Sequence, residues 1–117
     1  MKNYAAYAAE LFENGYNCAQ AVAVAFCDIT GLEPKAAAAM ASSFGGGMGR
    51  MREVCGAVSG MLLVAGILYG YDTPGDDAQK AAHYQRVQQM AELFRQEAGS
   101  IICREILKNP PSDPSPT

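Results

Sequence analysis

Apolar side chains recur every three or four positions along most of the chain, the spacing that places them on one face of an α-helix. This pattern predicts helices over residues 3–13, 18–28, 35–42 and 74–98, and a short helix after Ser100. Residues suited to helix starts stand where they are needed, with Asn17 and Thr73 as caps and Pro34 at a first helical position. The pattern favours an all-α fold.

One stretch departs from this pattern, because residues 54–71 contain no charged side chain. A helix that is apolar all round has to be buried on all sides. We therefore expect a compact bundle of roughly five to six helices around a central apolar helix over about residues 53–71. The bundle forms a single helical domain over residues 1–108. The proline-rich residues 109–117 form an extended or disordered tail.

A membrane would also bury such a helix, but the stretch fits a membrane span poorly. Its 18 residues are at the lower edge of the ~17–25 that a span needs. It contains four glycines, and acidic rather than basic residues follow it. We expect no membrane span. Gly56 and Gly60 share one helix face, which favours close packing between helices, with a dimer axis as one place for it. We predict a homodimer.

Composition narrows the classes of function. The 117-residue chain carries a net charge of −3 and has no basic cluster, which argues against a nucleic acid partner. Its first residues lack the pattern of a signal peptide. We therefore expect a cytoplasmic protein, whose cysteines stay reduced.

Four cysteines, Cys18, Cys27, Cys55 and Cys103, are the candidate chemistry. They form no Cys-x-x-Cys or Cys-x-x-Cys-His motif, which argues against a zinc ribbon, a thioredoxin-type site and covalently bound haem. All except Cys27 fall in or near the first turn of a predicted helix, where the helix dipole stabilises a thiolate and lowers the thiol pKa. The alternative is that cysteines are buried as small hydrophobic side chains. That alternative is strongest for Cys27.

A run of glycines precedes Cys55. The backbone N–H groups of Gly45, Gly46 and Gly47, with Arg50 and Arg52 close by, are suited to binding an anionic cofactor or ligand. A nucleotide site is only weakly supported, because a predicted helix precedes the run and no Gly-Lys-Ser or Gly-Lys-Thr follows it. The alternative is a tight crossing at which two backbones touch.

The remaining polar residues fit ordinary structural roles. His83 lies among polar neighbours, and we expect it at the surface. Asp76 and Asp77 fit the start of a helix better than a metal site. The glutamates form no Glu-x-x-His pattern of the kind that holds two iron ions.

Four blocks of the sequence carry the glycines and cysteines together: GYNCAQAV at 15–22, GGGMGR at 45–50, VCGAVSG at 54–60 and GSIICR at 99–104. In order and spacing they resemble the C_GCAxxG_C_C family, small redox-active proteins with four characteristic cysteines and a Cys-Gly-Ala-x-x-Gly motif. The resemblance covers nearly the whole chain. It implies a redox or metal-related role, in a family often encoded near transporter genes.

The resemblance also assigns the cysteines. Cys18, Cys55 and Cys103 fall at family positions, and Cys27 is then an additional, structural cysteine. The family's fourth cysteine lies beyond the position of Cys103, where this sequence has a proline-rich segment. Either this member lacks that cysteine or the chain is truncated. The resemblance then leaves a three-thiolate site, or a site completed by another segment or a partner chain.

Two hypotheses follow. In the first, the chain is a redox-active protein centred on Cys55 with Cys18 and Cys103. It uses thiol–disulfide chemistry, or binds a metal ion or iron–sulfur cluster through these thiolates. As an enzyme it would be a thiol- or metal-dependent oxidoreductase, acting with a redox partner or a transport-related protein. In the second, it is a non-catalytic helical module for oligomerisation or interaction, with structural cysteines. A Cys55 sulfur in a cleft at a helix start favours the first, and one sealed in apolar packing favours the second.

Overall fold

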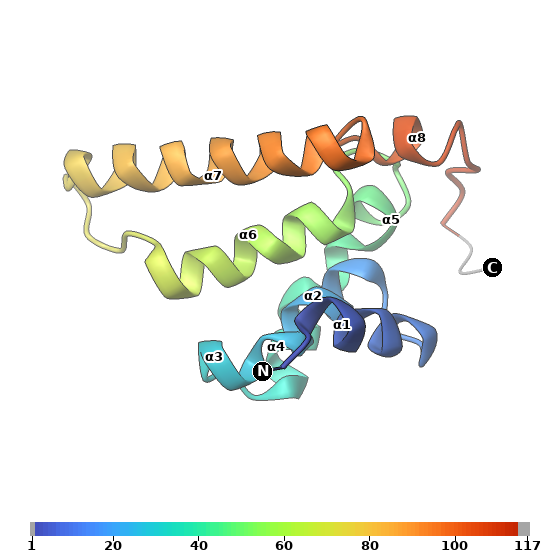
Figure 1. Ribbon diagram of the computed structural model, residues 1–117, viewed down its shortest axis with the longest axis horizontal. Coiled ribbons are helices and arrows are strands. Elements are labelled where there is room, and N and C mark those ends of the chain that lie inside the picture. The colour runs from blue at the N-terminus through green and yellow to red at the C-terminus, as the bar shows by residue number, and fades with distance from the viewer. Residues whose placement is uncertain (1, 115–117) are drawn as a thin grey trace.

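Helices make up the regular secondary structure of residues 2–114, the part of the chain that the computed structural model describes (Figure 1). The longer helices are α1 (Tyr4–Glu13), α2 (Cys18–Ala25), α4 (Pro34–Ala41), α6 (Gly56–Tyr69) and α7 (Asp77–Ala98). The short ones are α3 (Cys27–Thr30), η1 (Ser42–Phe44), α5 (Gly45–Met48) and α8 (Cys103–Ile106). Within these residues the extended pairing is limited to an isolated bridge between Val54 and Ile102. The predicted all-α fold is confirmed.

The helix starts follow the local sequence. Asn17 caps α2 in a capping box, in which its side chain accepts from the N–H of Gln20 and the Gln20 side chain accepts from the N–H of Asn17. Pro34 stands at the first position of α4, as predicted. At α7 the cap is Asp76, which accepts from the N–H of Gln79, and the prediction of Thr73 as cap is wrong. The helix therefore begins at Asp77 rather than at residue 74.

The core forms around α2, which packs against α1, α4 and α6. Its centre consists of small side chains: Ala19, Ala23, Val24, Ala37 and Ala41. Small residues let the helix axes approach, and a Cβ added to Gly60 would lie 2.7 Å from the carbonyl oxygen of Ala19. The glycine face of α6 is therefore covered by α2 of the same chain, and the suggestion that it packs across a dimer axis is wrong.

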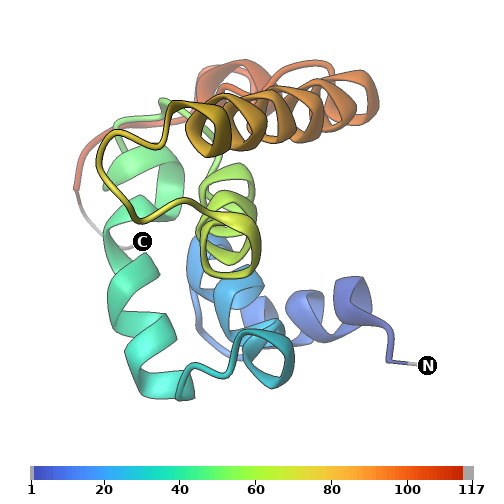
Figure 2. The same cartoon turned by 90° about the vertical axis from the view of Figure 1, so that its left-hand side faces the viewer.

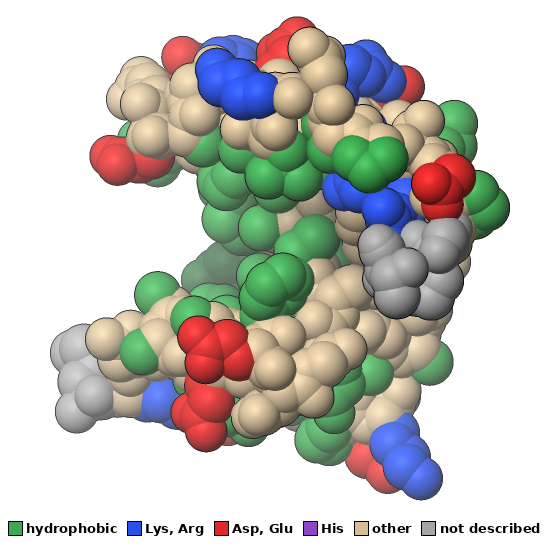
Figure 3. Space-filling view, turned by 90° about the vertical axis from the view of Figure 1, so that its right-hand side faces the viewer, with side chains coloured by type: hydrophobic (Ala, Val, Ile, Leu, Met, Phe, Trp, Pro, Cys, Tyr) green, Lys and Arg blue, Asp and Glu red, His purple; other side chains and the backbone are tan. Residues whose placement is uncertain are grey.

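The predicted central helix is buried or partly buried as far as Ala65 but exposed at its end. The prediction of burial on all sides is wrong for the last turn of α6, where Ile67 is 47% and Tyr69 58% exposed. This end extends beyond α2, and α7 lies alongside it (Figures 1 and 2). Figure 3 shows a hollow lined by hydrophobic side chains between α7 and the layer of α1 to α4. No helix of the described residues is long and apolar enough to cross a membrane.

The long helix α7 rests on α6 through His83. The prediction of a surface histidine is wrong, because His83 is only 7% exposed. Its Nδ1 lies 3.0 Å from a guanidinium nitrogen of Arg86, and that nitrogen also donates to the carbonyl of Tyr69 at 3.4 Å. The ring of Tyr71 meets the imidazole edge-on. The histidine therefore faces the C-terminal end of α6, together with Arg86.

Candidate functional site

Cys55 and Cys103 are held together by the backbone. The segments 52–55 and 101–104 run antiparallel and exchange backbone hydrogen bonds. The N–H of Cys55 donates to the carbonyl oxygen of Ile101 at 2.7 Å, and the N–H of Cys103 donates to the carbonyl oxygen of Glu53 at 2.6 Å. The bridge between Val54 and Ile102 lies between these two bonds. Because successive side chains alternate in extended chain, Cys55 and Cys103 lie on the same face as a diagonal pair, typically ~7–8 Å apart.

Cys18 also lies beside Cys55, although it belongs to a different helix, α2. It is the first residue of α2, and Cys55 is the residue that caps α6. A Cβ added to Gly56 would collide with the sulfur of Cys18 and would lie 2.9 Å from the carbonyl oxygen of Phe44. A glycine directly after Cys55 therefore makes the space that the Cys18 sulfur occupies.

The three cysteines line one open pocket of about 770 Å³. Asn17, glycines, two arginines and several apolar side chains also line it: Gly45, Gly46, Gly49, Arg50, Arg52, Phe12, Ile106, Leu107 and Pro114. None of the described lining residues is acidic. The predicted candidates Gly45, Gly46, Arg50 and Arg52 thus meet the predicted cysteines. Gly47 is buried behind them.

The glycine run forms a left-handed turn. Residues 46–50 all have positive φ, and so does Arg52. For Met48, Arg50 and Arg52 this conformation costs roughly 1–2 kcal/mol each. A Cβ on Gly47 would lie 2.8 Å from the Cβ of Cys103. The turn therefore wraps closely against Cys103, as in the predicted tight crossing, and it directs the two arginines into the pocket wall.

The two arginines differ in their contacts. Arg52 donates from Nη1 to the sulfur of Cys103 at 3.7 Å and from Nε to the carbonyl of Pro111 at 2.9 Å. The Nε of Arg50 is buried and has no hydrogen-bond partner in the described part of the chain. Arg52 thus links a cysteine to the C-terminal segment, whereas Arg50 keeps hydrogen-bonding capacity at the pocket.

The electrostatic environment of Cys55 differs from the prediction. Burial raises the pKa of the Cys55 thiol above its usual value, and the neighbouring Cys18 and Cys103 raise it further. Hydrogen bonds from the N–H groups of Ala57 and Val58 act in the opposite direction, as expected at a helix start, but they are the weaker effect. The predicted lowering of the pKa by the helix start is therefore wrong for Cys55.

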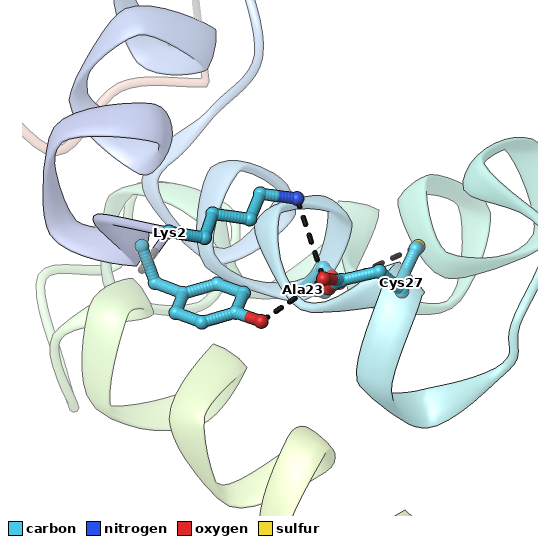
Figure 4. Close-up of polar contacts among 5 residues, drawn as sticks. Lys2, Ala23 and Cys27 are labelled. Carbon is cyan, nitrogen blue, oxygen red and sulfur yellow. Dashed lines mark hydrogen bonds and ion pairs between the residues drawn. The ribbon is translucent and has the colours of Figure 1, made fainter.

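Cys27 lies away from the pocket. Contrary to the predicted helix over residues 18–28, Phe26 leaves the helical conformation and Cys27 begins the short α3. Its sulfur donates to the carbonyl of Ala23 at 3.7 Å (Figure 4). Burial raises its pKa, and the charge of Asp28 raises it further. Cys27 packs against the core cluster, in keeping with a structural role.

A metal centre does not fit this arrangement. Among the described residues no group of three or more His, Cys, Asp or Glu side chains could hold a metal ion. The thiols of Cys18, Cys55 and Cys103 share a pocket without forming such a ligand set. We therefore derive no chemistry through a metal ion or an iron–sulfur cluster.

Two parts of the pocket were not anticipated. Asn17 was expected only as a helix cap, but its Nδ2 also donates to the carbonyl of Ser42 at 3.1 Å beside the glycine run. The Pro111 carbonyl binds Arg52, and Pro114 lines the pocket. The capping signal located Asn17 without its second contact, and the tail carries no periodic pattern that would have located either proline.

Residues 16–116 match the profile of the C_GCAxxG_C_C family, whose members are described as "Putative redox-active protein". No curated protein and no solved structure matches the chain. The match spans all three pocket cysteines and agrees with the resemblance seen in the sequence blocks.

Proposed function

Because the chain belongs to the C_GCAxxG_C_C family, described as redox-active, we propose that it exchanges thiols and disulfides at Cys55, with Cys18 and Cys103 as partner thiols. One observation carries the proposal. These three cysteines lie 37 and 48 residues apart in the sequence, yet they line one pocket. Packing alone gives no reason for the three to meet at a solvent-accessible cavity, because Cys27 is accommodated beside the core without one.

Cys55 is the central thiol. Both Cys18 and Cys103 act on it electrostatically, so each is close enough to influence its ionisation. It is half-buried, at the start of α6, and it faces the pocket rather than sealed apolar packing. That environment favours the redox hypothesis over structural cysteines.

The reaction begins with the reduced protein and a disulfide RSSR. Cys55 loses its proton to solvent, and its thiolate attacks one sulfur of RSSR. The substrate S–S bond breaks, a mixed disulfide forms, and RS⁻ leaves and takes up a proton. Cys18 or Cys103, deprotonated in turn, then attacks the Cys55 sulfur and releases a second RSH. The protein loses two electrons and two protons, and RSSR gains both to become two RSH.

The raised pKa of Cys55 supports this direction of electron flow. A thiol of high pKa is a poor leaving group, so a protein disulfide that contains Cys55 is broken slowly by attack that expels Cys55. A dithiol protein is a strong oxidant when its reduced form is stabilised, for example by a low thiol pKa. The Cys55 thiolate is not stabilised in this way, which favours reduction of other disulfides. We therefore propose a reductant of disulfides, whose thiols are regenerated by a redox partner in the cytoplasm.

The test is oxidation of the fully reduced protein with a small neutral disulfide, hydroxyethyl disulfide, followed by peptide mapping. We expect a disulfide between Cys55 and either Cys18 or Cys103, and its loss in Cys55→Ser. Cys27→Ser is the matched control and should behave as the unaltered chain. Absence of any such disulfide, or stoichiometric iron, zinc or copper in anaerobically purified protein that is lost in Cys55→Ser, would overturn the proposal.

A second candidate function is supported by exposed apolar surface. Ile67, Leu68 and Tyr69 at the end of α6 are exposed, and Leu93 on α7 is 64% exposed. Exposed apolar side chains on two neighbouring helices can serve as an interaction surface. We propose that they form the surface of a homodimer, a role that is compatible with redox chemistry at the pocket.

A further inference from the structure

The charge of the cysteine pocket contrasts with that of the chain. The whole sequence carries a net charge of −3, yet the described residues that line the pocket include Arg50 and Arg52 and no acidic side chain. Figure 3 views the molecule from the side of α5 and α8 and shows basic side chains gathered beneath the upper layer. The pocket is therefore a local positive region beside three thiols.

Arg50 has hydrogen-bonding capacity that no described residue uses. Its Nε is buried, and the described residues offer it no hydrogen-bond partner. The ion pairs Lys2–Asp28, Arg95–Glu92 and Arg104–Glu53 do not involve Arg50. A buried donor without a partner is costly, and a bound anion would supply the missing acceptor.

The backbone holds Arg50 in a strained, left-handed conformation. Arg50 has a φ of 68°, a conformation that side-chain-bearing residues rarely adopt. The left-handed turn before it is packed against Arg52 and Cys103 through Gly47. The side chain thus projects from a rigid turn rather than from a freely moving loop.

We propose that the substrate of the pocket is a small disulfide that bears a carboxylate, which Arg50 binds while Cys55 attacks its S–S bond. The inference rests on the proposed function and adds the class of substrate. The pocket volume of about 770 Å³ lies within the ~300–1,000 Å³ usual for small-molecule sites. The electron balance is that of the exchange described above, and a symmetric disulfide with one carboxylate on each half gives two molecules of a carboxylate-bearing thiol.

The experiment compares three disulfides of similar size that differ in charge: dithiodipropionate, hydroxyethyl disulfide and cystamine. Each rate of oxidation of the reduced protein is divided by the rate with free mercaptoethanol, which removes intrinsic differences in reactivity. At low salt we expect the anion to be favoured over the neutral disulfide about tenfold or more, and cystamine to be slowest. Raising the ionic strength should shrink this preference, because salt screens the arginines.

Arg50→Gln should reduce the ratio of the anionic to the neutral rate to near one. Arg95→Gln removes the same charge from the exposed face of α7 and should leave the ratio unchanged. Suberate, which matches dithiodipropionate in length but has no S–S bond, should raise the melting temperature of the protein at low salt. That readout requires no redox reaction and no variant.

The outcomes separate the two proposals. Equal normalised rates for the three disulfides, or a preference that Arg50→Gln leaves intact, overturn the inference about the substrate and leave thiol–disulfide exchange standing. Failure of every disulfide to oxidise the pocket cysteines overturns the proposed function. If Arg50→Gln does not fold, the charge series, its salt dependence and the suberate shift on the unaltered protein decide the question.

Discussion

The sulfur of Cys18 occupies the space into which a side chain at Gly56 would extend. A Cβ on Gly56 would lie closer to that sulfur than the 3.0 Å that real Cβ atoms respect. Glycine is therefore required after Cys55, because its lack of a side chain lets the first residue of α2 reach the first turn of α6. One residue type at one position brings two cysteines together that are 37 positions apart in the sequence.

Gly56→Ala should therefore displace Cys18 and destabilise the fold by about 1–3 kcal/mol, the usual cost of overpacking. Urea unfolding of the reduced protein measures this. Gly66→Ala is the control on the same helix, because nothing lies within 4 Å of an added Cβ there. Alanine at position 66 should stabilise the helix by about 0.5–1 kcal/mol. Equal stabilities of the two variants would contradict the packing argument.

Alkaline pH should weaken the reduced fold through Cys55. Because burial raises its pKa in the folded state, the neutral thiol is favoured by folding. This contribution to stability is fully present below the unfolded value of about 8.5 and is lost as the pH rises through the folded value. As the pH rises above about 8.5, the free energy of unfolding should fall less steeply in Cys55→Ala than in the unaltered chain. Superimposable curves would show that Cys55 does not carry the effect.

Arg52→Gln should release the C-terminal segment from the pocket. The substitution removes the bond from Arg52 to the Pro111 carbonyl, and a hydrogen bond to a charged group contributes about 1.5–3 kcal/mol. Limited tryptic cleavage after Lys108 should become about tenfold faster or more. Arg95→Gln, on the exposed face of α7, should leave the cleavage rate unchanged. An unchanged rate in Arg52→Gln would mean that other contacts hold the segment.

His83→Ala should loosen α7 rather than unfold the whole chain. It leaves a cavity against α6 and removes one of the partners of Arg86, at a cost of about 1–3 kcal/mol. Hydrogen exchange should accelerate in α7 while the amides of α2 stay protected. Gln85→Ala, at an exposed position of the same helix, serves as the control. Equal acceleration in α2 would show that α7 is not an independent unit.

The proposed homodimer predicts a concentration-dependent mass. Sedimentation at micromolar concentration should give a dimer, and Leu93→Glu should shift the equilibrium to monomer by placing charge on the exposed apolar surface. Gln88→Glu adds the same charge at another exposed position of α7 and should leave the dimer intact. A monomeric unaltered chain would count against the dimer.

Local signals in the sequence were enough for most of the longer helices and for three cysteine positions at helix starts. Asn17 stands directly before an apolar repeat, and its capping box forms as that pattern predicts. Cys18, Cys55 and Cys103 do stand at helix starts, although α2 is the one of these three helices with a side-chain cap. Pattern and capping depend on neighbouring residues, so one sequence reveals them.

Most features that depend on distant residues were not predicted. The pairing of segments 52–55 and 101–104 involves short extended stretches with no periodic pattern. The left-handed turn includes Met48, Arg50 and Arg52, whose positive φ no propensity would suggest. The raised pKa of Cys55 comes from burial by the assembled fold, which outweighs the helix start. The pairing and the turn help to bring the three cysteines together at one pocket.

The antiparallel pairing of 52–55 with 101–104 has a consequence for synthesis on the ribosome. Cys18 and Cys55 both leave the ribosome before Cys103, which follows Cys55 by 48 residues. At ~5–20 residues per second this is a delay of roughly 2–10 s, during which the first two thiols have no third neighbour. The nascent chain therefore passes through a stage with two pocket cysteines, and translation of segment 101–104 adds the third.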